Sequence, residues 1–68
     1  MTMTYIFSGD SGSSTILAES PDAAAVKYDS KVKSMEQLMT KIASVGGYIT
    51  VTEDGQVIER ISQDGERL

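Results

Sequence analysis

The chain has 68 residues and no cysteine, so one small domain is expected, without disulfides or thiolate metal sites. At this size, folding buries only about 60% of the surface that the unfolded chain exposes, and stability is limited to a few kcal/mol. Ten acidic and six basic residues give a net charge of −4. This balance argues against general nucleic-acid binding, which needs a positive face, and suits solubility or a partner with a basic surface.

The N-terminal part of the chain predicts a β-hairpin. Residues 3–8 alternate along a strand, which places Tyr5 and Phe7 on the same face. The small polar residues 9–14 predict a long loop, and residues 15–19 predict the second strand.

A helix is predicted to start at the Ser-Pro-Asp run of residues 20–22. Serine caps such a helix, proline suits its first position, and aspartate faces the positive end of the helix dipole. The three alanines at 23–25 predict that this helix lies close to the sheet beneath it. No proline or glycine forces a break at residues 29–34, but we expect two helices because Ser34 has the features of a second start.

The second helix carries the clearest pattern in the chain. Residues 34–37, Ser-Met-Glu-Gln, have the pattern of a capping box. In this motif the serine hydroxyl accepts from the backbone amide three residues on, and the glutamine side chain accepts from the backbone amide of the serine. The glycine pair 46–47 supplies a left-handed residue that ends the helix. Its apolar stripe comprises Met35, Leu38, Met39, Ile42 and Val45.

A second hairpin is predicted around the Asp-Gly turn at residues 54–55. A two-residue turn would pair Val51 with Ile58, whereas a three-residue loop with a glycine bulge would pair Val51 with Val57. The second register is slightly preferred because it gathers more apolar side chains on one face: Ile49, Val51, Val57 and Ile61.

The predicted fold class is α+β, in the order β-β-α-α-β-β. We expect one four-stranded antiparallel sheet with both helices packed on one face. Residues 1–62 form the expected domain, and residues 63–68 a charged tail that frays. There is neither a signal-peptide pattern nor an apolar run of about 20 residues, so a cytoplasmic location without membrane contact is expected.

Catalysis is not expected. The Gly-Asp-Ser-Gly run at residues 9–12 matches the letters around a serine-protease nucleophile, but the chain has no histidine to act as general base. The same run leads into a strand and lacks a lysine, which excludes a phosphate cradle. Without histidine or cysteine, no metal site or cofactor is expected.

A protein-binding surface is expected instead. Alternation cannot place every aromatic side chain beneath two short helices, so some are expected on the open sheet face. An acidic turn beside them would steer a basic partner. The predicted surface comprises Tyr5, Phe7, Tyr48, Glu53, Asp54 and Glu59.

The residues also allow two other functions. A ridge of helical lysines could serve a nucleic-acid-binding accessory domain, although nucleic acid is the less favoured partner. Self-association into a homodimer would compensate for the small core. The ridge comprises Lys27, Lys31, Lys33 and Lys41.

The general character of the chain is similar to that of small phage-encoded inhibitors of host defence complexes. The likeness rests on small size, acidity, the absence of cofactor ligands and a one-layer sheet, not on a motif. It implies a non-catalytic inhibitor that docks on a basic surface of a larger complex, and it assigns no residue.

Overall fold

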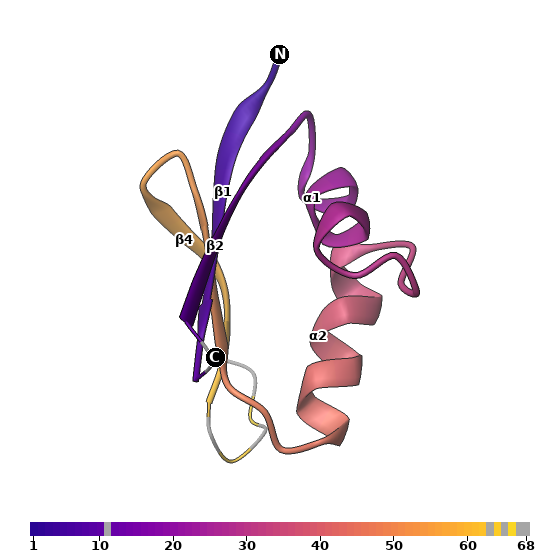
Figure 1. Ribbon diagram of the computed structural model, residues 1–68. Coiled ribbons are helices and arrows are strands. Elements are labelled where there is room, and N and C mark those ends of the chain that lie inside the picture. The colour runs from indigo at the N-terminus through magenta and orange to yellow at the C-terminus, as the bar shows by residue number, and fades with distance from the viewer. Residues whose placement is uncertain (11, 63, 65, 67–68) are drawn as a thin grey trace.

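The computed structural model describes every residue except 11, 63, 65, 67 and 68. Its strands form one antiparallel sheet in the order β2-β1-β3-β4, and both helices lie against the same face of that sheet (Figure 1). The predicted α+β class and the predicted element order are therefore confirmed. The elements are β1 (Met3–Gly9), β2 (Gly12–Ala18), α1 (Pro21–Tyr28), α2 (Met35–Ser44), β3 (Ile49–Glu53) and β4 (Gln56–Ile61).

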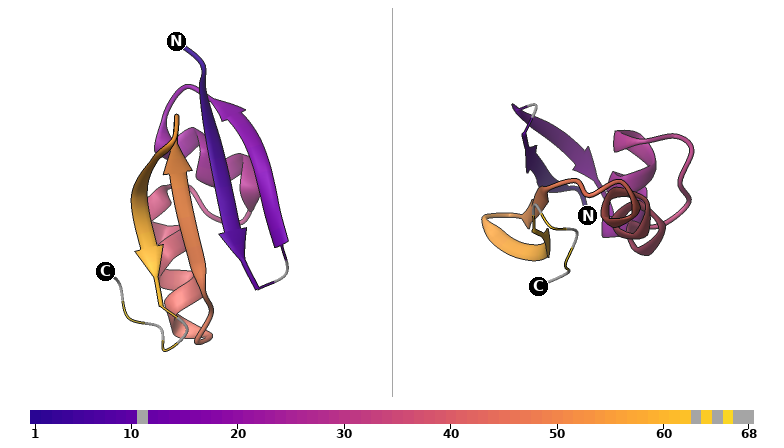
Figure 2. Two further views of the ribbon diagram at one scale, coloured as in Figure 1. Left: turned by 90° about the vertical axis from the view of Figure 1, so that its left-hand side faces the viewer. Right: turned by 90° about the horizontal axis from the view of Figure 1, so that it is seen from below.

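The first hairpin is tighter than the sequence indicated. Its strands extend through most of the predicted loop at residues 9–14, and Gly9 pairs with Gly12. Ser13 and Ser14 consequently belong to β2. In the sheet, β1 is central and pairs with β3 as well as β2, so β2 and β4 form the two outer edges (Figure 2).

Both helices begin where the sequence predicted. Ser20 Oγ accepts from Ala23 N at 3.1 Å, and Ser34 Oγ accepts from Gln37 N at 3.2 Å. One detail differs, because the Gln37 side chain accepts from Lys33 N at 2.8 Å and not from the amide of Ser34.

The expected break between the helices is confirmed, and Asp29 organises it. The Asp29 side chain accepts from Lys31 N at 2.9 Å, and its carbonyl accepts from Val32 N at 3.1 Å. Asp22, in the first turn of α1, accepts from Met35 N at 3.0 Å, so it links α1 to the N-terminus of α2. Side-chain acceptors of this kind replace the intrahelical partners that a continuous helix would supply.

The C-terminal end of α2 is closed by the predicted glycine pair. Gly46 has φ of 67°, and Gly47 N donates to Ile42 O at 3.0 Å, which is the Schellman arrangement. Val45 is the C-cap residue and is 78% exposed, so it does not continue the buried stripe as predicted.

The core lies between the sheet and the helices. Ala24 and Ala25 are fully buried, which confirms that α1 packs close to the sheet. Met35 and Met39 are core residues. The buried hydrophobic residues are Tyr5, Phe7, Ala18, Ala24, Ala25, Val32, Met35, Leu38, Met39, Ile49, Val51 and Ile61.

The second hairpin adopts neither of the two registers considered. Its turn has two residues, as Glu53 pairs with Gln56, but the register then shifts between Val51 and Thr52. The shift makes Ile58 an extra residue on β4, a β-bulge. As a result Ile61 pairs with Ile49 and is buried, whereas Val57 is 51% exposed on the opposite face.

Most of the predicted C-terminal tail, residues 63–68, lies outside the described residues. Of the described part, Glu66 N donates to Ser62 Oγ at 3.1 Å. No helix in the described part of the chain is both long and apolar enough to cross a membrane.

Candidate functional site

The aromatic side chains expected on the open sheet face are not all there. Tyr5 and Phe7 are buried on the helix-covered face, so the prediction that they are exposed is wrong. Both rings belong to the same core cluster as Ala24 and Ala25 of α1, and Phe7 stacks on Tyr28 with ring centroids 4.5 Å apart. Tyr48 is 37% exposed and lies just before β3.

Tyr5 has a structural partner in the acidic turn. Its hydroxyl donates to Glu53 Oε2 at 2.5 Å across the junction of β1 and β3. Burial, followed by the hydrogen bond to the Glu53 carboxylate, raises the pKa of Tyr5 to about 12. The structure thus brings together two predicted surface residues, but in a contact within the chain.

Asp54 also binds within the chain. Its Oδ1 accepts from Thr4 N at 2.9 Å, and its amide donates to Thr4 O at 2.9 Å. Asp54 has φ of 47°, in the left-handed region that aspartate tolerates in a two-residue hairpin turn. Glu53 and Asp54 therefore join the second hairpin to β1.

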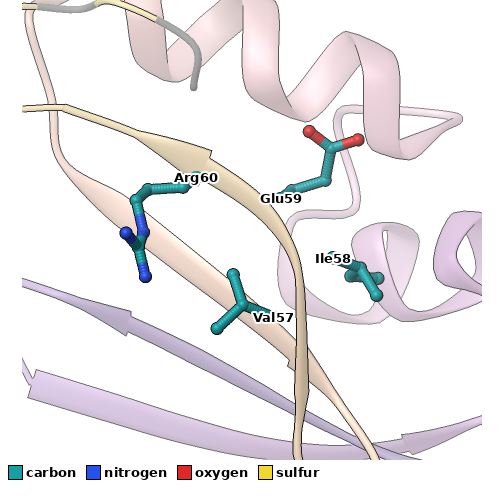
Figure 3. A pocket seen from close by; sticks show the side chains of 4 residues that line it. All are labelled: Val57, Ile58, Glu59 and Arg60. Carbon is teal, nitrogen blue, oxygen red and sulfur yellow. The ribbon is translucent and has the colours of Figure 1, made fainter.

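Glu59, the third predicted acidic residue, lies on the bulged part of β4. Figure 3 shows that the Glu59 and Ile58 side chains extend toward the helices, whereas Val57 and Arg60 lie on the other side of the strand. The hollow that these four residues line measures about 250 Å³. All four are consecutive residues of one strand. The hollow therefore results from the local shape of the bulged strand and does not bring together functional side chains from several elements.

The open face of the sheet, the side away from the helices, is dominated by hydroxyl side chains. The strand pairing places three rows of residues across it, and Ile6 lies between Thr15 and Thr52 in the middle row. Among the described residues of this face, Arg60 carries the charge, and it lies opposite Thr50. By alternation the described members are Thr4, Ile6, Ser8, Ser13, Thr15, Leu17, Thr50, Thr52, Val57 and Arg60.

A groove on the helix side of the molecule gathers residues from more elements. It lies between the ends of both helices, the end of β1 and the start of β3, and its volume is about 320 Å³. Leu38 and Ile49 are buried residues of its lining, and Val45 is the most exposed of its large hydrophobic residues. Three of the chain's large exposed hydrophobic residues border it: Tyr28, Val45 and Tyr48.

The polar side chains of this groove come from three segments. Asp29, which follows α1, forms an ion pair with Lys41 of α2. The hydrogen bond from Lys41, supported by the backbone amide of Lys31, lowers the pKa of Asp29 below its ordinary value. Asp10, in the turn of the first hairpin, is the remaining charged residue of the lining.

The predicted lysine ridge is partly engaged within the chain. Lys27 Nζ donates to Leu17 O at 2.6 Å, and Lys41 pairs with Asp29. Lys31 and Lys33 lie in the connector between the helices. Among the described residues, no group of three or more acidic side chains is placed to hold a metal ion.

The groove was not predicted from the sequence. The sequence indicated a separate local role for each of its residues. Val45 belonged to the helix stripe, Asp29 lay where a helix weakens, and Tyr48 lay at the start of a strand. The glycine pair after α2 was the signal that could have indicated it, because the turn it makes brings Tyr48 back beside α2. Comparison of the chain with protein families, with curated proteins and with solved structures found no match.

Proposed function

We propose that this protein is a small, non-catalytic protein-binding module that receives an apolar segment of its partner in the groove beside α2. The observation that supports this is the clustering of Tyr28, Val45 and Tyr48 around a floor that includes Leu38 and Ile49. Exposed aliphatic and aromatic groups that border a concave apolar floor are typical of interaction sites. The proposal replaces the predicted aromatic surface on the open sheet face.

The proposed partner carries an apolar anchor next to basic residues. The chain has a net charge of −4, which favours approach of a basic surface. At the groove, the Asp29–Lys41 pair offers one acceptor and one donor to polar groups of the partner. Binding energy would come mainly from the anchor, and charge would act mainly on the association rate.

Selection from a displayed library of random peptides tests the proposal without knowledge of the partner. We expect enriched peptides to combine an aromatic or aliphatic residue with lysine or arginine. On titration into ¹⁵N-labelled protein, such peptides should shift the amide signals of residues 41–49.

Two matched variants locate the binding site. Val45→Lys places a charge at the groove and should weaken peptide binding by about tenfold or more, equivalent to about 1.4 kcal/mol. Val57→Lys makes the same change at another exposed valine, on the open face, and should leave binding unaltered. Equal affinity of both variants for the selected peptides would exclude the groove as the site.

A further inference from the structure

The outer edge of β2 has the features of a strand that accepts another strand. β2 reads Gly-Ser-Ser-Thr-Ile-Leu-Ala, and it contains neither a charged residue nor a proline. Its pairing with β1 is regular from Met3–Ala18 to Gly9–Gly12. Natural edge strands are usually protected by charges, prolines or bulges, and β2 has none of these among its own residues.

The hydrogen bonds around Thr4 show which backbone groups of β2 face outward. Thr4 pairs with Leu17, yet the Thr4 amide and carbonyl both bond to Asp54, on the β3 side. Thr4 and Leu17 are therefore a pair without mutual hydrogen bonds, so the Leu17 groups point away from β1. Lys27 confirms this direction because its ammonium group reaches the Leu17 carbonyl from outside. By alternation, the amides and carbonyls of Ser13 and Thr15 also point outward.

We propose that the β2 edge pairs with the β2 edge of a second copy of this chain, antiparallel and centred on Ser14. In this register Ser13 of each copy faces Thr15 of the other, and four backbone hydrogen bonds form. The bond from Lys27 to the Leu17 carbonyl stays intact. The two sheets become one continuous eight-stranded sheet, with the helices of both copies on one side.

A second copy fits this edge because the edge is complementary to itself. Serine and threonine are the only side chains at the centre of the pairing, so no like charges meet there. At each end, the antiparallel arrangement brings the turn that holds Asp10 toward the Leu17 end of the other β2, where Lys27 lies. Asp10 of each copy would thus lie near Lys27 of the other, which gives one opposite-charge contact at each end of the paired strands. This surface is separate from the proposed use of the groove beside α2.

Sedimentation equilibrium from about 10 μM to about 1 mM tests the proposal. This range suits a weak dimer, which is expected because two paired edge strands form a small interface and interfaces below about 1,200 Å² are typically weak. We expect a reversible dimer for the wild-type chain. Thr15→Pro removes an outward amide but no bond to β1, and it should weaken the dimer at least about tenfold. Thr15→Lys should do the same through charge repulsion, and Val57→Lys on β4 should not. Circular dichroism verifies that each variant is folded.

Single-cysteine variants test the register, and the absence of natural cysteines makes the result unambiguous. Paired residues without mutual hydrogen bonds lie about 4.5 Å apart between Cα atoms, within disulfide range. Ser14→Cys should therefore form a covalent dimer quickly under mild oxidation. Leu17→Cys should form one slowly, because six residues along a strand separate the two sulfurs by about 20 Å. A wild-type monomer at every concentration, dimers that persist in both Thr15 variants, or faster cross-linking of Leu17→Cys would each overturn the proposal.

Discussion

The two outer strands of the sheet, β2 and β4, differ in how they meet solvent. β4 carries a bulge at Ile58, and its sequence includes Gln56, Glu59 and Arg60. β2 has a regular ladder, and none of its side chains is charged. The bulge also serves the core, because it moves Ile61 beneath the helices and Arg60 to the open face. The extra residue at Ile58 thus helps to complete the core and protects the β4 edge from pairing, whereas the β2 edge remains suited to pairing.

The largest expected effect is on the free energy of unfolding, and it comes from the buried residue that β4 contributes to the core. Ile61 is fully buried and Leu17 is 58% exposed. We expect Ile61→Ala to lower the free energy of unfolding by about 2–5 kcal/mol, and Leu17→Ala by less than about 1 kcal/mol. Urea denaturation measures both values.

Ile61→Val extends this test if Ile61→Ala is unfolded from the start, with an expected loss of about 0.5–1.5 kcal/mol. Similar losses for Leu17→Ala and Ile61→Ala would contradict the contrast between the two edge strands.

The next prediction concerns the place where β1 meets the start of β3. A Cβ atom at Gly9 would lie 2.7 Å from the carbonyl oxygen of Tyr48. Gly9→Ala should therefore displace the segment before β3 and cost about 1–3 kcal/mol. Ser8→Ala, one residue earlier on the open face, is the matched control; it removes only the exposed hydroxyl contact with Ser13 Oγ, 3.1 Å away on β2.

Amide hydrogen exchange shows where the strain from Gly9→Ala acts. Protection should fall first in β3 and β4, while the β1–β2 ladder keeps most of its protection. Loss of protection in β2 before β4 would show that the two edges are not coupled to the core in the proposed way.

A smaller effect is expected from the contact that joins the two hairpins. Tyr5→Phe removes the hydrogen bond to Glu53 and should cost about 1 kcal/mol at neutral pH. The folded pKa of Tyr5, about 12, lies above the ordinary value of 10.0, so folding favours the protonated hydroxyl. This contribution is complete below pH 10 and is lost as the pH rises toward 12.

Thermal unfolding of the wild-type chain and of Tyr5→Phe between pH 8 and pH 11.5 measures this contribution. All other ionisable groups are common to the two proteins, so the difference between the two curves isolates Tyr5. A difference that stays constant with pH would show that Tyr5 ionises as it does in the unfolded chain.

The smallest expected effect on stability belongs to charges placed on the two edges. Thr15→Lys and Val57→Lys should each change the free energy of unfolding by less than about 0.5 kcal/mol, since both positions are exposed. Denaturation at about 10 μM, where the proposed dimer is dissociated, measures this. A large loss for Thr15→Lys alone would mean that β2 is packed within the monomer and is not an accessible edge.

Much of the fold was predictable because local signals agreed with one another. Ser20, Ser34 and Gly46 gave the helix ends, and the alternation of Tyr5 and Phe7 gave a common face. The sequence could not tell which face of the first hairpin the helices cover, because alternation defines two faces but does not say which of them the helices pack on.

The bulge and the groove could not be predicted for a similar reason. Both registers considered for the second hairpin assumed an unbroken ladder, whereas burial of Ile61 favours an extra residue at Ile58. The groove arises only when Tyr28 and Val45, 17 positions apart in the sequence, meet beside the end of β1. Long-range packing of this kind leaves no periodic signal in a single sequence.

The central place of β1 has a consequence for how the chain is made. Tyr5 is synthesised before its partner Glu53, which lies 48 residues downstream. The first hairpin and α1 can form early, whereas one side of β1 has no strand to bond until β3 is synthesised. During translation, β1 therefore keeps one edge without a strand partner until the residues of β3 have been added.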